Sequence, residues 1–477
     1  MKTEKQNALE RYEELLASGG AAYDRLNRLF DPGTFVELGR FVKRSTTSFD
    51  KDPGTEFEGV VTGYGAVDGK LVFAYAQDFS RMKGAMSEAH AKKIVAVYDA
   101  ALKSGAPVVG IFDSAGAKVL EGVSVLTGYG SVMNAAAKAS GVVPQIAVVS
   151  GPCSGSSAVI AEIADVVIGA EDHGKLYINS PFGLSKKGSP DAGTMKEAAA
   201  DGALSILKAD AESAIAEAKK LLSLLPSNSV EGTAYNENGD SANRYVSADG
   251  NAQEIVAELA DAGSAVELGG AYEPCVRTYI ASIGGITTGV ASYEAALTAK
   301  GAEKAAKFVS FCDAFSVPVV TLVDCDGPAY SSESESAPLA SKMAKLASVY
   351  ALSTTPKVTV ITGKAYGSAF TILGSKTLGA DVVYALPCSR ISIMAPEAAV
   401  EFLYADRIKA ASDPLAEKDA VSAEWEEVCA PVNAARSGDI DDVIDQTELR
   451  MRVAASLEML SGKATLAPYK KHGNLPL

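Results

Sequence analysis

Short apolar runs recur along the chain, and each is followed by glycine and other small residues. The run at 108–112 contains no polar residue, which is typical of a strand buried on both faces of a sheet, and the runs at 358–362 and 381–386 also predict buried strands. Between such runs lie segments with apolar residues at helical spacing. Strands that alternate with helices predict an α/β layered fold, with ligand sites at the carboxyl ends of the strands.

Other segments have a different periodicity. Residues 59–76 alternate around a tight turn at 67–70, which predicts a β-hairpin, and 34–38 predicts one more strand. A helix is expected to run to about Lys103, after a loop at 77–89. Further helices are predicted within 1–30, at 128–139, 195–225 and 439–460; the last has one apolar face made by Ile444, Leu449, Val453 and Leu457.

The same arrangement occurs twice. Residues 144–181 and 356–394 each read as a buried strand, a glycine turn, a helix and an Ala-Asp-Val-Val strand. Each copy runs eleven residues from its proline to its turn glycine, which is Gly155 in the first copy and Gly367 in the second. The repeated spacing indicates that the two segments have the same local structure.

The repetition extends upstream of both segments. A Pro-Val-Val run leads to Asp113 in the first half and to Asp324 in the second, and 29–39 matches 259–269. A repeat of about 210 to 230 residues predicts two domains of one fold and no solenoid. We expect a first domain at 1–226, a polar linker rich in Asn, Ser and Gly at 227–251, and a second domain at 252–477.

Composition narrows the class of protein. The 477 residues are 47% hydrophobic and 22% charged, and the net charge of −15 argues against nucleic acid or an anionic membrane as the main partner. A ligand with phosphate groups would therefore need a local basic patch. Apolar runs are no longer than strands, and the polar start of the chain is unlike a signal peptide. The six scattered cysteines form no C-x-x-C pair, which predicts a cytoplasmic protein without disulfides or metal.

Side-chain chemistry has little support in the sequence. Ser154, Ser156 and Ser368 lie at turns, but no G-x-S-x-G elbow surrounds them and the chain has only three histidines. These serines are therefore read as small residues or helix caps. No histidine or carboxylate pattern predicts a metal site.

Backbone chemistry has more support. Four small-residue turns, at 113–118, 151–156, 325–328 and 367–369, follow predicted strands. Free N–H groups at the start of a helix can hold an anion or a developing oxyanion. Each turn taken alone is also compatible with simple packing of small residues. Two matched pairs favour duplicated oxyanion holes, which suit a reaction in which two carbonyl groups each become enolate-like.

Longer motifs cover nearly the whole chain in order. They are FDPGTFVEL (30–38), QDFSRMKGAMSEAHAKKI (77–94), DSAGAKVLEGV (113–123), VVSGPCSGS (148–156), KAAKFVSFCDAF (304–315), PKVTVITGKAYGSAF (356–370), GDIDDVI (438–444) and the terminal KKHGNLPL. With these motifs the chain resembles the carboxyltransferase (β) subunits of biotin-dependent acyl-CoA carboxylases and decarboxylases, of the propionyl-CoA carboxylase β and methylmalonyl-CoA decarboxylase α type.

The resemblance implies a fold and an activity. Each half would be a crotonase-like ββα-spiral domain, and the chain would move CO₂ between carboxybiotin and the α-carbon of a short-chain acyl-CoA, or run the reverse decarboxylation. Biotin would be carried by a separate biotin carboxyl carrier protein, and the other partners would be a biotin carboxylase or membrane decarboxylase subunits. A homo-hexamer (a dimer of trimers), or at least a homodimer, is implied. The expected location is cytoplasmic, or peripheral to a membrane decarboxylase complex.

The resemblance also implies site residues. On the acyl-CoA side, the N–H groups of Gly116 or Ala117 and of Gly155 or Ser156 would face the thioester oxygen. Ala115, Lys118, Gly151 and Ser154 would surround them. On the biotin side, Ser368 and Ala369 would be catalytic, and the surrounding residues would be Gly327, Pro328, Tyr366 and Gly367.

Two departures from the family pattern keep alternatives open. Ala115, Ser156 and Ser368 replace glycines, which is tolerable only where φ is negative. The family's D-x-P-G-F stretch is DCDGPAY here, followed by SSESES. One alternative is therefore a catalytically diverged structural or CoA-binding subunit. Another is a crotonase-type hydratase or hydrolase, for which Glu121 is the candidate acid.

Overall fold

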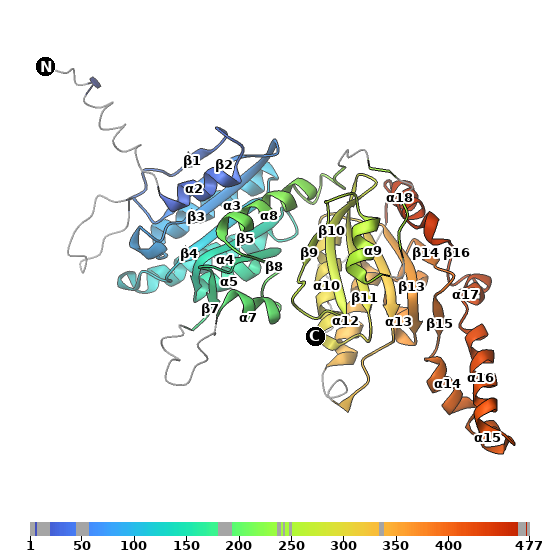
Figure 1. The fold of residues 1–477 in the computed structure, drawn as a ribbon. Coiled ribbons are helices and arrows are strands. Elements are labelled where there is room, and N and C mark those ends of the chain that lie inside the picture. The colour runs from blue at the N-terminus through green and yellow to red at the C-terminus, as the bar shows by residue number, and fades with distance from the viewer. Residues whose placement is uncertain are drawn as a thin grey trace. The chain divides into compact units, whose positions relative to one another are not determined.

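The computed structural model describes residues 5–6, 20–43, 57–179, 193–235, 240–241, 244–247, 250–332, 338–465 and 474. The chain divides into two compact units, Met1–Ser223 and Leu224–Leu477 (Figure 1). The linker expected at 227–251 falls in the second unit and lies partly outside the described residues. The predicted domain bounds therefore stay a prediction.

The first unit is built on one eight-stranded sheet in the order β1-β2-β3-β4-β5-β6-β8, with β7 paired to β5. Strands β1 to β3 are antiparallel, and those from β3 onward are parallel. The strands are β1 Val36–Leu38, β2 Val60–Val67, β3 Lys70–Gln77, β4 Val108–Ser114, β5 Gln145–Ser154, β6 Val166–Ala170, β7 Lys175–Tyr177 and β8 Ile206–Lys208. The helices are α2 Ala21–Leu29, α3 Glu88–Ser104, α4 Val123–Ala139, α5 Ser156–Ile163, α7 Met195–Ala200 and α8 Ala211–Leu224.

The second unit repeats this sheet strand by strand. Its order is β16-β14-β13-β12-β11-β10-β9, with β15 paired to β13. The strands are β9 Val266–Leu268, β10 Val276–Ile283, β11 Ile286–Glu294, β12 Val319–Cys325, β13 Lys357–Tyr366, β14 Val382–Ala385, β15 Arg390–Ser392 and β16 Asp442–Val443. Read in reverse, this order matches that of the first unit, β9 corresponding to β1 and β16 to β8. The predicted duplication is confirmed.

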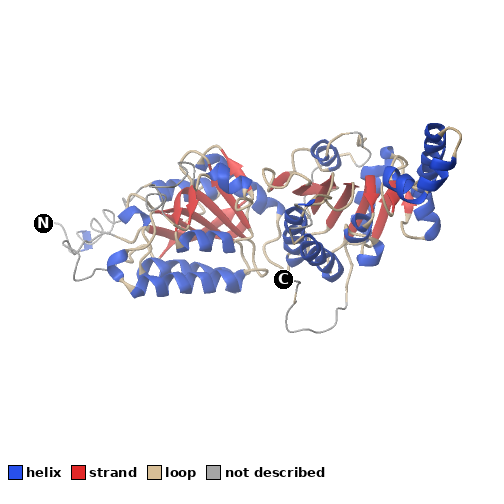
Figure 2. Ribbon diagram, turned by 90° about the horizontal axis from the view of Figure 1, so that it is seen from below, coloured by secondary structure: helices blue, strands red, loops and turns tan. Residues whose placement is uncertain are grey.

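Within the described residues, the second unit has more helices than the first. They are α9 Ala252–Leu259, α10 Ala299–Ala314, α12 Leu339–Leu352, α13 Ser368–Ile372, α14 Pro396–Leu403, α15 Ala405–Ala410, α16 Pro414–Val428, α17 Pro431–Ser437 and α18 Leu449–Met459. In each unit the strands form one layer bordered by helices, as Figure 2 shows in red and blue. All seven residues of β4 are buried, as expected for a strand covered on both faces.

Most of the predicted helices and strands are confirmed; two are corrected here, and the C-terminal helix is treated below. The hairpin is β2 and β3, and the strands expected at 34–38, 108–112, 358–362 and 381–386 are β1, β4, β13 and β14. The helix predicted from residue 128 begins five residues earlier, at Val123. Residues 195–225 contain β8 between α7 and α8. Of the helices expected within 1–30, the structure describes α2, and most of the rest lies outside the described residues.

The C-terminal helix prediction was wrong at its start. Residues 439–448 are not a continuous helix, because the N–H groups of Asp441 and Ile444 donate to Val383 O and Ala385 O of β14. This pairing forms β16, and α18 begins only at Leu449. Ile444 is buried as expected, but from a strand end. Sheet pairing has overridden the helical periodicity.

Candidate active site

The first unit brings two predicted turns together at the carboxyl ends of its central strands. Strands β4 and β5 are parallel neighbours, and Ser114 pairs with Cys153 near the ends of both. The turn after β4 and the start of α5 therefore lie side by side. A Cβ atom at Gly116 would lie 3.1 Å from Ser154 Oγ, which shows how closely the turns approach.

The turn after β4 presents one backbone donor. Met86 forms a parallel bridge with Ala117: its N–H donates to Gly116 O (2.8 Å) and its carbonyl accepts from Lys118 N (2.8 Å). Gly116 N–H donates to Ser114 Oγ at 3.1 Å. In this pattern the N–H of Ala117 points away from Met86, and it has no partner among the described residues. Of the Gly116 and Ala117 pair, Ala117 is the available donor.

The start of α5 presents the second donor. Gly155, with φ 60°, precedes the helix, and its N–H donates to Tyr177 O of β7 at 2.9 Å. That N–H cannot also bind an oxyanion. The N–H of Ser156, the first helical residue, has no partner among the described residues and carries the positive end of the helix dipole. Of the four candidate donors, Gly116, Ala117, Gly155 and Ser156, it is Ala117 and Ser156 whose N–H groups have no partner among the described residues.

The glycine substitutions that set this chain apart are tolerated. Positive φ occurs at Gly116, Gly155, Gly327 and Gly367, all of which have kept glycine. None of the replaced positions, Ala115, Ser156 and Ser368, is among the described residues with positive φ. The replacements therefore occur at positions where φ is not positive, as the sequence analysis required.

Asp113 is held by side-chain contacts near the end of β4, just before the turn that carries Ala117. Its carboxylate is 2.7 Å from Arg25 Nη1, and its N–H donates to Gln77 Oε1. A Cβ at Gly151 would lie 2.0 Å from Asp113 Oδ1, so only glycine allows this packing. Burial raises the pKa of Asp113, and the Arg25 hydrogen bond opposes that rise. Because the carboxylate is engaged, Asp113 positions the strand end and is not a free base.

Both carboxylate oxygens of Glu121, the candidate acid, have partners. Its Oε2 accepts the N–H of Glu88 at the start of α3 (2.8 Å), and its Oε1 lies 3.4 Å from Lys118 Nζ. Both side chains of the Lys118 pair are almost fully covered. These contacts do not favour the alternative of a hydratase that uses Glu121, because this carboxylate already caps a helix. Lys118 lies in the expected turn, with its ammonium group tied to Glu121.

The second unit repeats the geometry but not the donors. Leu297 forms the equivalent bridge with Pro328: its N–H donates to Gly327 O and its carbonyl accepts from Ala329 N, both at 2.9 Å. Pro328 thus stands where the first unit has Ala117, and proline has no N–H. The two holes are not equivalent, which corrects the expectation of a matched duplication.

On the other side of this site, the helix start is preserved. Gly367 N–H donates to Ser392 O of β15 at 2.8 Å, as Gly155 does to β7. The N–H groups of Ser368 and Ala369 at the start of α13 have no partner among the described residues. Tyr366 is almost fully buried just before them. Among the described residues, the free donors found at this site therefore come from one segment, the start of α13.

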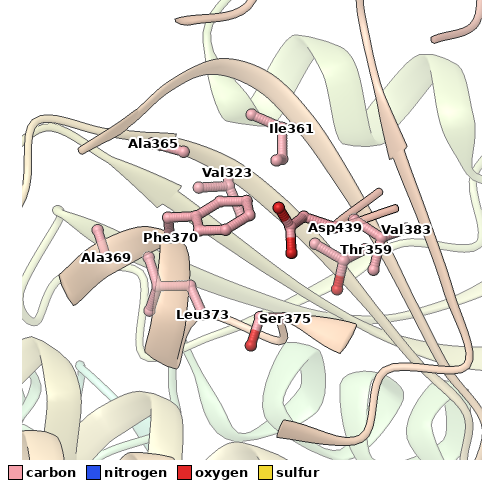
Figure 3. Close-up of a pocket in the computed structure, with 10 residues that line it drawn as sticks. All are labelled: Val323, Thr359, Ile361, Ala365, Ala369, Phe370, Leu373, Ser375, Val383 and Asp439. Atoms are coloured by element: carbon pink, nitrogen blue, oxygen red, sulfur yellow. The ribbon is translucent and has the colours of Figure 1, made fainter. Parts of the chain in front are cut away.

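A small pocket lies behind that helix start (Figure 3). Strands β12 to β14 and helix α13 line it, and the carboxylate of Asp439 also borders it. Its volume of about 10 Å³ is enough for about one water molecule. A ring the size of biotin does not fit there, so this pocket is not a biotin site.

Two further observations concern the described residues as a whole. Their His, Cys, Asp and Glu side chains form no cluster that could hold a metal ion. None of their helices combines the length and apolar character needed to cross a membrane.

Comparison with known proteins gives a consistent result. The family model "Carboxyl transferase domain" matches residues 19–475. The chain is 36% identical to the methylmalonyl-CoA decarboxylase subunit alpha of Propionigenium modestum, with 98% of this chain and 96% of that protein covered. It is 35% identical to the propionyl-CoA carboxylase beta chain of Saccharopolyspora erythraea (96% and 90%).

Solved structures agree. Transcarboxylase 12S, described as a hexamer with methylmalonyl-CoA and methylmalonic acid bound, superimposes with a TM-score of 0.93 at 33% identity, over 100% of this chain and 99% of that one. A single-chain, multi-domain long-chain acyl-CoA carboxylase superimposes with a TM-score of 0.81 over 95% of this chain and 49% of that one. At 22% identity, the latter likeness concerns the fold alone.

Proposed function

Because the chain belongs to the carboxyl transferase family, we propose that its first unit holds the acyl-CoA thioester and its second unit receives biotin. The chain is a carboxyltransferase subunit of a biotin-dependent acyl-CoA carboxylase or decarboxylase, built from two tandem crotonase-like domains. The assignment of acyl-CoA to the first unit and of biotin to the second goes beyond what family membership shows.

The difference between Ala117 and Pro328 carries this assignment. An acyl-CoA enolate concentrates its negative charge on one oxygen, which is best stabilised by donors that converge from two sides. In the first unit, Ala117 N–H and Ser156 N–H come from two neighbouring segments. In the second unit, Pro328 removes one of the two, which leaves the start of α13 as the donor segment within the described part of the chain.

This chain's residues need no catalytic side chain for the proposed reaction. Ala117 and Ser156 would donate to the thioester oxygen and stabilise the negative charge that develops when the α-carbon loses its proton or its carboxylate. Ser368 and Ala369 would donate to the ureido oxygen of biotin. Biotin, when bound, supplies the group that carries CO₂ and exchanges the proton with the α-carbon. The residues Ala115, Gly151 and Ser154 shape the first site, and Gly327, Tyr366 and Gly367 the second.

The partners follow from the same proposal. Biotin would arrive on a separate carrier protein, and a biotin carboxylase or the membrane subunits of a decarboxylase would complete the cycle. The relative from Propionigenium modestum is named a decarboxylase subunit, and that from Saccharopolyspora erythraea a carboxylase chain. We propose the same hexameric assembly that is described for transcarboxylase 12S, at the cytoplasmic side of the cell or bound peripherally to such a decarboxylase.

The test measures CO₂ release from malonyl-, methylmalonyl- and glutaconyl-CoA by the purified chain, with and without free biotin. Biotin-dependent release from one of them is expected. No release from any, by a folded protein that still binds CoA, would instead favour a catalytically diverged subunit.

A pair of substitutions tests the assignment of the ligands. Ala117→Pro removes one N–H, and Pro328 shows that proline is accommodated at this bridge. We expect kcat to fall by about 10² to 10³, the typical loss of one oxyanion donor, with unchanged circular dichroism. Pro328→Ala is the matched control and should not lower kcat. Full activity in Ala117→Pro would contradict the assignment.

A further inference from the structure

Two buried lysines occupy equivalent positions in the two units but have different surroundings. Lys93 is the sixth residue of α3, and Lys304 is the sixth residue of α10. Lys304 Nζ donates to three carbonyl oxygens, those of Gly269 (2.8 Å), Tyr272 (2.6 Å) and Val276 (2.6 Å). Three donors are all that an ammonium group has, so Lys304 is saturated.

Lys93 has kept one of these three contacts. Its Nζ donates to Val60 O at 2.6 Å, and Val60 begins β2 as Val276 begins β10. Two N–H donors of Lys93 have no partner among the described residues. The residue is only 6% exposed, so bulk water solvates its charge poorly. Because a buried charge with unfilled donors is costly, this arrangement calls for an acceptor.

A cavity of about 270 Å³ adjoins Lys93. It is lined by Leu38, Gly39, Val42, Thr62, Ala89, Lys92, Lys93, Ala96 and Val97, and it shares no residue with the turns after β4 and β5. A volume near 150 Å³ already holds benzene, and ligand pockets begin near 300 Å³. Its walls are mostly aliphatic, and the Thr62 hydroxyl is engaged with Leu38 O at 2.7 Å.

The neighbouring charged groups have partners of their own. Glu37 accepts from Tyr23 Oη at 2.9 Å and lies 3.4 Å from Arg40 Nε. Lys92 lies 2.7 Å from Glu88, on the exposed side of α3.

The remaining acid near Lys93 is Glu58, which accepts from Ser87 Oγ at 2.8 Å. None of the described acids forms an ion pair with Lys93, so its unfilled donors are available to a ligand.

We propose that this cavity is a second ligand site, for a short- or medium-chain aliphatic carboxylate. The carboxylate oxygens would accept from Lys93 Nζ, and the aliphatic tail would lie against Leu38, Val42 and Val97. Binding would complete the hydrogen bonds of Lys93 as the carbonyl oxygens do for Lys304.

The charge of Lys93 gives the site an expected pH dependence. Burial lowers the pKa of Lys93 to about 8, Glu37 and Glu58 oppose that change, and Arg81 adds to it. A carboxylate ligand favours the charged ammonium, so binding should weaken as the pH rises through about 8 and beyond.

Octanoate is the probe, titrated calorimetrically into the full-length protein at pH 7 with and without saturating CoA. We expect about one site per chain, unaffected by CoA. Lys93→Met removes the donor and Ala96→Phe fills the cavity from the exposed face of α3. Each should weaken binding at least tenfold. Lys103→Met, at an exposed lysine of α3 that does not line the cavity, is the matched control and should leave binding within about twofold.

Each other result would overturn the proposal. No heat from octanoate in the wild-type protein excludes the site, and unchanged affinity in both Lys93→Met and Ala96→Phe excludes this cavity. Binding that CoA abolishes would place octanoate at the acyl-CoA site. Ala96→Phe keeps the test decisive should Lys93→Met fail to fold, as circular dichroism would reveal.

Discussion

At the scale of single residues, the chemistry that we propose for the carboxyltransferase site depends on backbone groups, and three buried titratable side chains near it have structural partners. Asp113 and Glu121 are engaged by Arg25 and by the start of α3, respectively. His90 is fully buried beside Gln77, with 3.4 Å between Gln77 Nε2 and His90 Nε2. These groups support the strand ends that present Ala117 and Ser156.

The buried histidine predicts a pH dependence of stability. Burial lowers the pKa of His90 to about 3, whereas an unfolded chain has its ordinary value of 6.5. Between these values the unfolded state binds more protons, so stability is complete above pH 6.5 and is lost as the pH falls. This group alone should make the free energy of unfolding about 2 kcal/mol lower at pH 5 than at pH 7.

Urea unfolding at several pH values measures that slope. His90→Gln should reduce it, and His173→Gln, at a ring that is 81% exposed, should leave it unchanged. Equal slopes in the wild type and in His90→Gln would contradict the prediction.

At the scale of elements, one buried carboxylate joins the hairpin of the second unit to its last helix. Asp261 accepts from the N–H groups of Gly284 (2.9 Å) and Gly285 (2.8 Å) at the turn between β10 and β11. It also lies 2.5 Å from Arg450 Nη2 of α18, which is fully buried. In the first unit, Asp31 holds the equivalent turn between β2 and β3 through Asp68 N and Gly69 N, at 3.2 and 3.0 Å.

Removing Arg450 should therefore destabilise the second unit. Arg450→Met leaves the Asp261 charge buried without its partner, and losing one member of such a pair costs about 3 to 5 kcal/mol. Arg452→Met, at an arginine of the same helix whose side chain is 40% exposed, should cost less than about 1 kcal/mol. Chemical denaturation of both variants measures the difference, and similar losses would show that Arg450 has no special role.

At the scale of the whole molecule, large apolar side chains remain exposed in both units. Val119, four residues before α4, and Val123, its first residue, are 81% and 75% exposed. Phe402 of α14 and Leu415 of α16 are 77% and 75% exposed. Apolar surface of this kind is typical of an interface between subunits. It supports the proposed assembly of several copies.

A hexamer of this 49.2 kDa chain has a mass of about 295 kDa. We expect this mass from light scattering after size-exclusion chromatography. Val123→Lys should lower it, because a buried charge is costly at an apolar interface, and Lys92→Met, at an exposed position of α3, should not. A wild-type mass near that of one chain at micromolar concentration would contradict the hexamer.

Local patterns in the sequence determined the duplication, the buried strands, the glycine turns and the family. These features depend on spacing and on φ, which neighbouring residues set: Gly116, Gly155, Gly327 and Gly367 all have the positive φ that only glycine adopts readily. The folded chain decided which N–H groups are left free. Gly155 donates to Tyr177, Glu121 caps α3, Asp441 pairs with β14, and Pro328 takes the place of Ala117. The hydrogen bonds of Gly155, Glu121 and Asp441, and the bridges that align Pro328 with Ala117, all join segments that are distant in the chain. Such contacts can form only once the fold has brought both partners together.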